Sequence, residues 1–317
     1  MTRDYSTVFV SFGDSRMSAA AARIGSQAGA MNAFDRIHVW NENDLDPDFR
    51  RRFVDKLIIG SKGYGFWCWK PRVIGMCLES MRDGDVVMYT DIGCHLVPAG
   101  RETLFEYFEC ARQSPSGIFG FAGHGPNARL AICAKGDLLA YFGVYDDERI
   151  LNSPYFGGAT LVAAKKPESV AFMKRWEQAF ADGFELIDDS PSIRPDKPGF
   201  LRSGHDQASL SILCALHGGA SRENDRLEPL PGTVAKPGPV ALLRDKGIGN
   251  NSDAFPRALK ILLGCIPYKP LRKGIGNWYK RRKFDRIGKE LRRKGLTPPA
   301  SGAERTVNVQ GRERTDP

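Results

Sequence analysis

The chain has 317 residues, of which 42% are hydrophobic and 26% charged, and this composition excludes a disordered, collagenous or coiled-coil protein. Its formal net charge of +9 is typical of proteins that bind nucleic acid or an anionic membrane. Residues 268–294 account for the excess, because they hold twelve lysines and arginines and two acids. The rest of the chain is close to neutral, so the charge characterises one segment.

The seven cysteines are odd in number and include no Cys-x-x-Cys pair, which favours reduced thiols over a disulfide framework or a zinc site. The N-terminus runs directly into an apolar strand with no signal-peptide pattern. No uncharged apolar run approaches the ~18 residues that a membrane span needs. We therefore expect a cytoplasmic protein that is soluble or peripheral on a membrane.

The apolar pattern alternates between strand and helix from the N-terminus to about residue 220. Strands are predicted at 7–12, 34–40, 86–89, 118–122 and 159–163. Helices are predicted at 15–28, 71–82, 101–113, 167–181 and 206–217. This order is typical of an α/β domain with a mostly parallel central sheet and crossover helices.

Beyond Ser221 the periodicity weakens and proline and glycine become frequent. We therefore predict four parts of the chain. They are a catalytic domain over 1–235, a Pro/Gly-rich connecting segment over 236–267, a basic amphipathic helical segment over 268–294 and a disordered tail over 295–317.

Asp91 directly follows the predicted strand over 86–89. In open α/β sheets, ligands bind beyond the carboxyl ends of the strands. A carboxylate at such a position can hold a divalent cation against a diphosphate, because hard cations prefer oxygen ligands. The alternative is that Asp91 only begins a turn before Gly93.

Lys62-Gly63-Tyr64-Gly65-Phe66-Trp67-Cys68-Trp69-Lys70-Pro71 combines aromatic rings, lysines and glycines before a helix. Glycines allow close backbone approach, rings stack, and a lysine can meet a phosphate. The segment lacks the third glycine of a dinucleotide fingerprint and the GK[ST] of a phosphate loop. If it is extended, Trp67 and Trp69 face one way; the alternative is an aromatic core segment.

Gly204-His205-Asp206-Gln207 opens an apolar helix. Asp206 is a candidate for catalysis. In the structural alternative it favours the positive end of the helix dipole, with Ser203 as the cap and His205 as a buried structural residue.

In this order, the three segments resemble a family of bacterial glycosyltransferases of polysaccharide, capsule and lipopolysaccharide synthesis. Its members show a GYGYWxWKP segment, a strand ending in YxDAG and a late HxxDQS-like helix start. Ala134-Lys135-Gly136-Asp137-Leu138 is similar to a further Thr-Lys-x-Asp-Leu element of the family. The resemblance covers roughly residues 5–217 and implies a single GT-A, Rossmann-like domain, here followed by the basic C-terminal extension.

The resemblance also implies roles for residues of this chain. Asp91 would hold the metal and the diphosphate, and Asp206 and Gln207 would face the donor sugar near its anomeric carbon. The catalytic set is then Asp206, Gln207 and Asp91. The donor and nucleotide set is Ser11, Phe12, Arg16, Arg23, Tyr64, Trp67, Trp69, Lys70, Asp91 and Gly93.

Gly93 departs from the usual Asp-x-Asp metal motif, because it stands where the second acid is expected. A Mn²⁺ or Mg²⁺ cofactor would bind Asp91 and, as the other candidate ligand, His205. His95, water or the donor phosphates would complete the shell.

The predicted reaction is transfer of a sugar from a UDP- or GDP-sugar to a hydroxyl of a glycan or lipid-linked acceptor. An inverting enzyme needs a general base, for which Asp206 is favoured over Asp188 and Asp189. A retaining enzyme needs none, and analogy favours retention. Two alternatives stay open: a nucleotidyltransferase that makes sugar nucleotides, and a nucleic-acid-binding protein that uses the basic segment.

The basic segment itself favours lipid over nucleic acid. Leu271, Ile275 and Trp278 share one helical face, and a second apolar stripe runs through Phe284, Ile287 and Leu291. Two short amphipathic helices on an anionic membrane surface are predicted, with a solvated tail as the alternative. We expect the protein on the inner face of the cytoplasmic membrane, with no specific nucleic acid partner.

Overall fold

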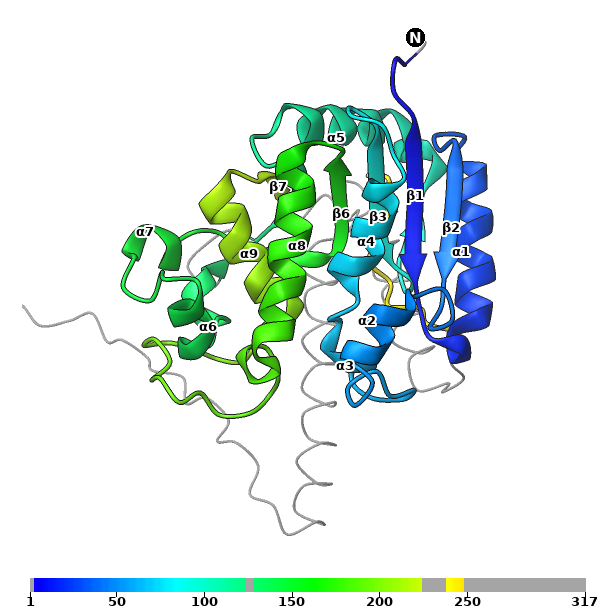
Figure 1. The fold of residues 1–317 in the computed structure, drawn as a ribbon. Coiled ribbons are helices and arrows are strands. Elements are labelled where there is room, and N and C mark those ends of the chain that lie inside the picture. The colour runs from blue at the N-terminus through cyan, green and yellow to red at the C-terminus, as the bar shows by residue number, and fades with distance from the viewer. Residues whose placement is uncertain (1–2, 124–127, 224–237, 248–317) are drawn as a thin grey trace, which may run out of the picture. The chain divides into compact units, whose positions relative to one another are not determined.

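The computed structural model describes residues 3–123, 128–223 and 238–247 (Figure 1). The chain divides into two compact units, Met1–Asn251 and Ser252–Pro317. The second unit lies outside the described residues, and with it lie the predicted basic helices at 268–294 and the predicted tail at 295–317.

A six-stranded sheet forms the centre of the first unit, with the strand order β2-β1-β3-β6-β5-β7. The strands are β1 Thr7–Phe12, β2 Arg36–Trp40, β3 Val86–Asp91, β5 Ile118–Ala122, β6 Phe156–Ala164 and β7 Ala220–Glu223. Five of them run in the same direction, and β6 is antiparallel to both of its neighbours. The predicted mostly parallel sheet is confirmed.

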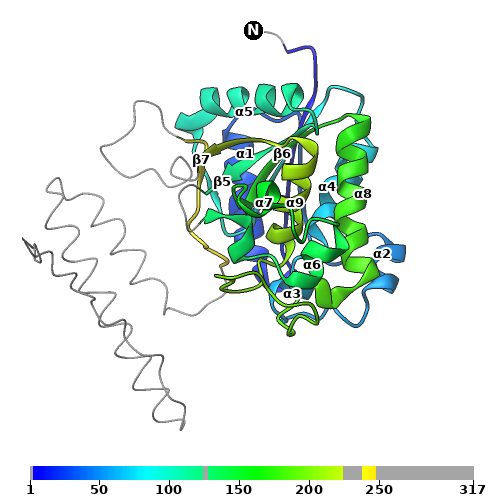
Figure 2. The ribbon, with the colours of Figure 1, turned by 90° about the vertical axis from the view of Figure 1, so that its left-hand side faces the viewer.

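Helices cover both faces of the sheet (Figure 2). Because side chains alternate along a strand, Phe9 and Met88 pack under α1 Ser18–Ala30 and α5 Arg101–Gln113. Val10 and Val87 face the other way, towards α4 Lys70–Glu79, α8 Pro167–Asp182 and α9 Asp206–His217. Both faces of the sheet are therefore buried, as in most parallel sheets.

Short elements complete the unit. The α-helical ones are α2 Pro47–Arg52, α3 Gly63–Phe66, α6 Gly136–Tyr141 and α7 Glu148–Leu151. The 3₁₀ turns are η1 Ser15–Met17, η2 Pro98–Gly100, η4 Leu130–Ile132 and η5 Phe184–Leu186. A two-stranded sheet joins β4 His95–Leu96 to β8 Val240–Ala241, which falls inside the predicted connecting segment 236–267.

Most predicted elements are confirmed, and their ends differ for identifiable reasons. The predicted helix over 15–28 begins as the 3₁₀ turn η1, in which the backbone amide of Arg16 donates to the carboxylate of Asp14. Ser203 is not the cap of α9, because His205 takes that position and the Ser203 hydroxyl donates to the carbonyl of Ile187 at 2.9 Å. Among the described residues, none of the helices is long and apolar enough to cross a bilayer.

Candidate active site

The carboxyl edge of the sheet brings together elements that are far apart in the sequence. Strands β1 and β3 end there, side by side, with Phe12 opposite Asp91. Because β6 is antiparallel, its first residues reach the same edge. Helices α4 and α9 begin there too, with Lys70 and Asp206 as their first residues.

Lys70 is the centre of a buried charge cluster at this edge. Its Nζ lies 2.7 Å from Oδ2 of Asp206, 2.9 Å from the carbonyl oxygen of Gly158 and 3.3 Å from Oδ1 of Asp91. The side chains of Lys70 and Asp206 are 1% and 2% exposed, whereas that of Asp91 is 36% exposed. Asp91 is therefore the carboxylate that solvent reaches, and a buried ion pair lies behind it.

The neighbouring carboxylates keep the ammonium of Lys70 charged. Burial opposes the charged form of Lys70, but the carboxylates of Asp206 and Asp91 outweigh it and raise the pKa of the ammonium above its ordinary value. Burial also raises the pKa of Asp206, and the charge of Lys70 offsets part of that rise. The three side chains therefore form one charge cluster, in which the carboxylate of Asp91 is the group that faces solvent.

Three further residues support this cluster, and they are not among the site residues predicted from the sequence. The hydroxyl of Tyr89 donates to Oδ1 of Asp91 at 2.6 Å, and burial raises the pKa of this phenol far above its ordinary value. The indole of Trp176 donates to the carbonyl of Asp206 at 3.1 Å. Gly158 approaches so closely that a Cβ there would lie 2.8 Å from Oδ2 of Asp206.

Gly158 and Tyr89 left a signal in the sequence, whereas Trp176 did not. The pair Gly157-Gly158 interrupts the apolar run of β6, and an isolated glycine pair in a strand marks a close approach of another group. Tyr89 and Asp91 also share a strand face at a spacing of two residues. Trp176 gave no such signal, because its spacing on α8 is that of a core residue.

The aromatic segment is not extended, so the condition under which Trp67 and Trp69 would face one way is not met. Residues 64–67 have positive φ angles between 50° and 84° and form a tight left-handed bend. The ring of Trp69 packs on Phe12 with centroids 4.1 Å apart, and its indole donates to the carbonyl of Gly63. The ring of Trp67 instead lies 5.6 Å from that of His205.

His205 belongs to a polar cluster at the rim of the site. Its Nε2 lies 2.8 Å from Oδ1 of Asp189 and 3.2 Å from Nζ of Lys62. Lys62 also pairs with Oδ2 of Asp189 at 2.5 Å. These contacts hold the pKa of the Asp189 carboxyl below its ordinary value, with the hydrogen bond from Lys62 as the main cause.

The described residues do not by themselves form a metal site. No group of three or more His, Cys, Asp or Glu side chains in the described ranges could hold an ion. At Gly93, a Cβ would lie 3.1 Å from the backbone of Arg244, so an acid at this position would require that backbone to shift by a few tenths of an ångström. Both histidines that were candidate ligands already have carboxylate partners. His205 is bonded to Asp189, and His95, which lies on β4, has its Nε2 3.1 Å from Oδ2 of Asp245.

The predicted donor residues on the first strand and helix make structural contacts with their side chains. The hydroxyl of Ser11 donates to the carbonyl of Thr90, and the ring of Phe12 is buried. Arg23 donates to the carbonyls of Ile92, Cys94 and Asp245. Arg16 forms a fork with Asp14 but is 41% exposed at the carboxyl end of β1.

The Lys135-Gly136-Asp137 element holds the loop that leads to His205. Nζ of Lys135, which is buried, donates to the carbonyl of Glu185 and to the hydroxyl of Ser190. The carboxylate of Asp137 accepts from the backbone amides of Ile193 and Arg194, both at 2.7 Å. This element therefore positions the rim of the site.

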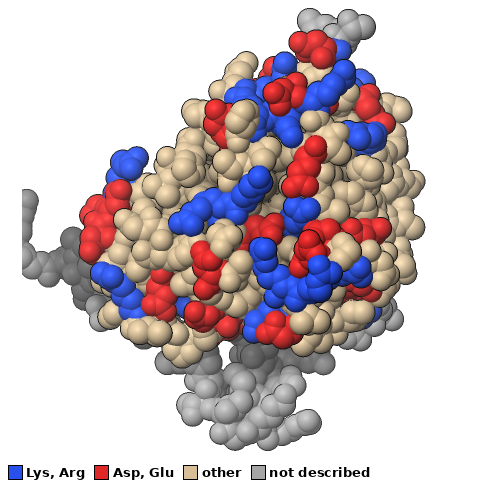
Figure 3. All heavy atoms as spheres, in the orientation of Figure 1, with Lys and Arg blue, Asp and Glu red and all other residues tan. Residues whose placement is uncertain are grey.

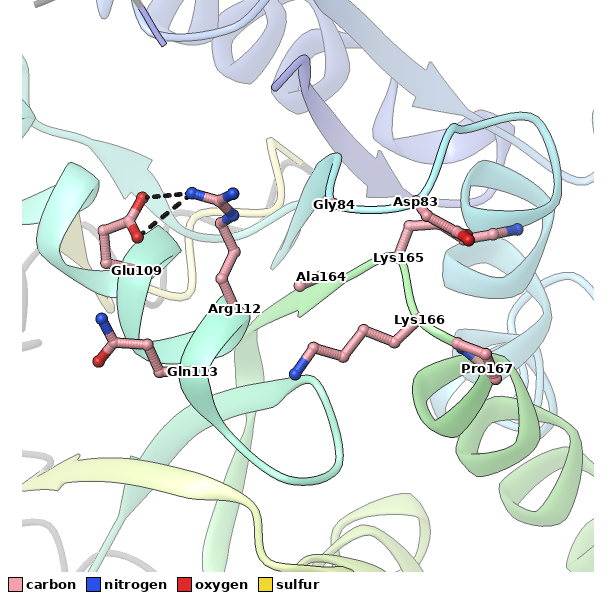
Figure 4. A pocket seen from close by; sticks show the side chains of 9 residues that line it. All are labelled: Asp83, Gly84, Glu109, Arg112, Gln113, Ala164, Lys165, Lys166 and Pro167. Atoms are coloured by element: carbon pink, nitrogen blue, oxygen red, sulfur yellow. Dashed lines mark hydrogen bonds and ion pairs between the residues drawn. The ribbon is translucent and has the colours of Figure 1, made fainter. Parts of the chain in front are cut away.

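A hollow of about 440 Å³ lies at the opposite edge of the sheet, where β3 begins and β6 ends (Figure 4). Its three cations are already bonded. Arg112 donates to Glu109, Nζ of Lys166 donates to the carbonyl of Ser114, and Nζ of Lys165 to that of Leu78. We therefore place the candidate site at the carboxyl edge, by its charges.

No protein-family model matches the sequence, and no curated protein matches it. Among solved structures, the chain is similar to the galactosyltransferase LgtC bound to donor and acceptor sugar analogues, at 15% identity over 69% of this chain and 73% of that one, with a TM-score of 0.34. It is also similar to mouse xyloside xylosyltransferase 1, at 12% identity, 69% and 84% coverage and a TM-score of 0.35.

A third similar structure is a glycosyltransferase involved in glycosylation of the major capsid of PBCV-1, at 8% identity, 70% and 84% coverage and a TM-score of 0.37. Identities of 15% or less and TM-scores below 0.5 are too low to establish an activity for this chain.

Proposed function

We propose that the chain is a GT-A-type glycosyltransferase. It moves a sugar from a UDP- or GDP-sugar to a hydroxyl of a glycan or lipid-linked acceptor in cell-surface polysaccharide synthesis. The observation that carries this proposal is the cluster in which buried Lys70 joins Asp206 to the solvent-reached Asp91 at the carboxyl edge of the sheet. Ligands of open α/β sheets bind at this edge.

The cluster suits a sugar better than a base or a peptide. Carboxylates accept hydrogen bonds from sugar hydroxyls, and the ammonium of Lys70, 3.3 Å from Oδ1 of Asp91, holds that carboxylate in place. Gln207, on the next position of α9, accepts from the hydroxyl of Tyr155 and is only partly buried. Asp91 and Gln207 are therefore the groups we assign to the donor sugar, with Asp206 as their buried support.

Burial of Asp206 favours retention over inversion. A general base must lie within hydrogen-bond reach of the acceptor hydroxyl. Oδ2 of Asp206 is already bonded to Lys70, and the side chain is 2% exposed. A retaining reaction requires no such base. In either reaction the departing diphosphate needs positive charge, for which the 41% exposed Arg16 is a candidate, while the buried Lys70 acts through Asp91.

We carry two expectations into this proposal from the sequence. A divalent cation would bind Asp91 together with donor phosphates, because Asp91 is the carboxylate of the Lys70 cluster that solvent reaches. The basic residues over 268–294 would hold the enzyme on the inner face of the cytoplasmic membrane.

The test is a calorimetric and thermal-shift screen of UDP-, GDP-, CMP- and dTDP-sugars, with and without Mn²⁺, on the wild-type chain and on Asp91→Asn. We expect one class of donor to bind and to be hydrolysed slowly. Asp91→Asn should lower turnover by about a hundredfold or more while the free energy of unfolding changes by less than about 1 kcal/mol. Full activity of Asp91→Asn would reject the site, and pyrophosphate release from an NTP and a sugar phosphate would favour a nucleotidyltransferase.

A further inference from the structure

The side chain of Gln207 is held on one side in the candidate site. Its Oε1 accepts from the hydroxyl of Tyr155, the residue that precedes β6. Its Cγ lies close to Gly158, because a Cβ at Gly158 would come within 2.8 Å of that atom and within 3.1 Å of Nζ of Lys70. Gln207 is therefore next to the Lys70 cluster, with its amide oxygen already bonded.

The contact between Tyr155 and Gln207 is supported by the backbone on both sides. The amide of Phe156 donates to Oγ of Ser211 at 2.8 Å, and this hydroxyl donates to the backbone carbonyl of Gln207 at 2.6 Å. Ser211 is fully buried. The ring of Tyr155 packs on Gly204, where a Cβ would lie 3.2 Å from Cε2 of the ring. The two side chains are therefore held together before a substrate binds.

The phenol of Tyr155 determines which way the amide of Gln207 faces. Burial raises the pKa of Tyr155 well above its ordinary value, so the phenol keeps its proton and has one O–H to donate. The guanidinium of Arg202 offsets part of that rise. Because a guanidinium only donates, it favours the lone pairs of the phenol oxygen and leaves the phenol proton for Oε1 of Gln207.

The opposite orientation of the amide is disfavoured. If the amide were turned over, its N–H would compete with Arg202 for the phenol oxygen, and the phenol proton would lose its acceptor among the described residues. An amide carries its oxygen on one side and its two N–H donors on the other. Nε2 of Gln207 therefore points away from Tyr155. It makes no hydrogen bond to any residue that the structure describes and is not fully enclosed by them, so a ligand can reach its donors.

The surface charge makes single oriented groups of this kind important for recognition. Basic and acidic side chains are interleaved over the face that Figure 3 shows. Exposed charges are screened beyond about 10 Å in salt, and mixed signs cancel further. Asp91 offers an acceptor at the Lys70 cluster, and Gln207 adds a donor to it. A sugar hydroxyl both accepts and donates, so the two groups together match it.

We propose that Tyr155 is a positioning residue that turns the amide of Gln207 so that its N–H donors face the bound nucleotide-sugar. Gln207 then donates to an oxygen of the donor, on its sugar or on its diphosphate, while its own oxygen stays bonded to Tyr155. The inference rests on the proposed function, because the oxygen belongs to the nucleotide-sugar assigned there.

The kinetic test measures donor hydrolysis by full-length Tyr155→Phe, Gln207→Met and the double variant. Tyr155→Phe removes only the hydroxyl and should lower kcat/KM by about tenfold, and Gln207→Met should lower it by about tenfold or more. The double variant should be no worse than Gln207→Met, because Tyr155 acts only through Gln207. The matched control is Tyr141→Phe, whose lost hydroxyl donates to Oδ2 of Asp182 at 2.7 Å on the surface. It should leave kcat/KM unchanged.

Spectra of the side-chain amides of ¹⁵N-labelled protein observe the donors directly. The signal pair that is missing from Gln207→Met belongs to Gln207. This pair should move downfield when a UDP- or GDP-sugar binds with Mg²⁺, and it should move less in Tyr155→Phe. A titration with UDP or GDP alone separates the two sources of the oxygen: a shift with the nucleotide alone assigns it to the diphosphate, and a shift that requires the nucleotide-sugar assigns it to the sugar.

Three results would overturn the proposal: additive losses in the double variant, an equal loss in the Tyr141→Phe control, or a Gln207 signal pair that does not move when the donor binds. If the wild-type chain binds no nucleotide-sugar at all, the proposed function fails. The role of Tyr155 is then decided on the substrate-free protein, in which Tyr155→Phe should narrow the Gln207 pair and move it towards the position of a free glutamine amide. An unchanged pair there would show that Tyr155 does not hold Gln207.

Discussion

The two edges of the sheet handle charge in opposite ways. At the carboxyl edge, Lys70 and Asp206 are buried while aliphatic side chains such as Ile193 stand in water. At the other edge, Lys165 and Lys166 are partly exposed and donate to nearby backbone carbonyls. The second arrangement is the ordinary one for a stable surface. The arrangement at the carboxyl edge costs stability, and such a cost is typical of a functional site.

Replacement of the buried ammonium should have the largest effect. Lys70→Met leaves Asp206 buried without its partner, and breaking a buried pair on one side costs about 3–5 kcal/mol. Lys166→Met at the opposite edge removes one hydrogen bond to a carbonyl and should cost about 1 kcal/mol or less. Urea unfolding of both variants measures the difference. Equal losses would show that the two edges are not distinct.

A methyl group at Gly158 tests how tightly the cluster is packed. Its Cβ would lie 2.8 Å from Oδ2 of Asp206 and 3.1 Å from Nζ of Lys70, so Gly158→Ala should cost about 1–3 kcal/mol and lower turnover. Gly29→Ala is the control, because nothing lies within 4 Å of a Cβ there, inside α1. It should raise stability by about 0.5–1 kcal/mol. A well-tolerated Gly158→Ala would mean that the pair has room to move.

Replacement of Lys62, in the polar cluster at the rim of the site, should have the smallest effect, and the effect should depend on pH. The pKa of Asp189 is held below its ordinary value, mainly by Lys62, so this carboxylate stabilises the folded state above the ordinary aspartate pKa. The contribution disappears as pH falls through the lower pKa of the folded state. Lys62→Met should therefore lower the Tm by a few degrees at most near neutrality.

The Tm curves of Lys62→Met and the wild type should converge in acid, where Asp189 is protonated in both proteins. Thermal unfolding followed across pH measures this convergence. A constant difference at every pH would contradict the assignment of the effect to Asp189.

Local patterns predicted the elements better than they predicted the site. Periodicity identified β1 and α5 because it reflects burial of one face, which is a local property. Asp91, Asp206 and Lys70 were candidates from their motifs, but their mutual contact depends on three elements, β3, α9 and α4, that meet only in the folded chain. The left-handed bend at residues 64–67 also escaped, because it places three bulky non-glycine residues at positive φ.

The contacts of Lys70 with Gly158 and Asp206 have a consequence for how the chain folds. Lys70 is separated from Gly158 by 88 positions and from Asp206 by 136. Contacts of such long range form late, because closure of the intervening chain must precede them. Until β6 pairs and α9 docks, desolvation of the Lys70 ammonium lacks most of its compensation. Completion of the tertiary structure and assembly of the charge cluster are therefore one kinetic event, and refolding intermediates that lack α9 should also lack the donor site.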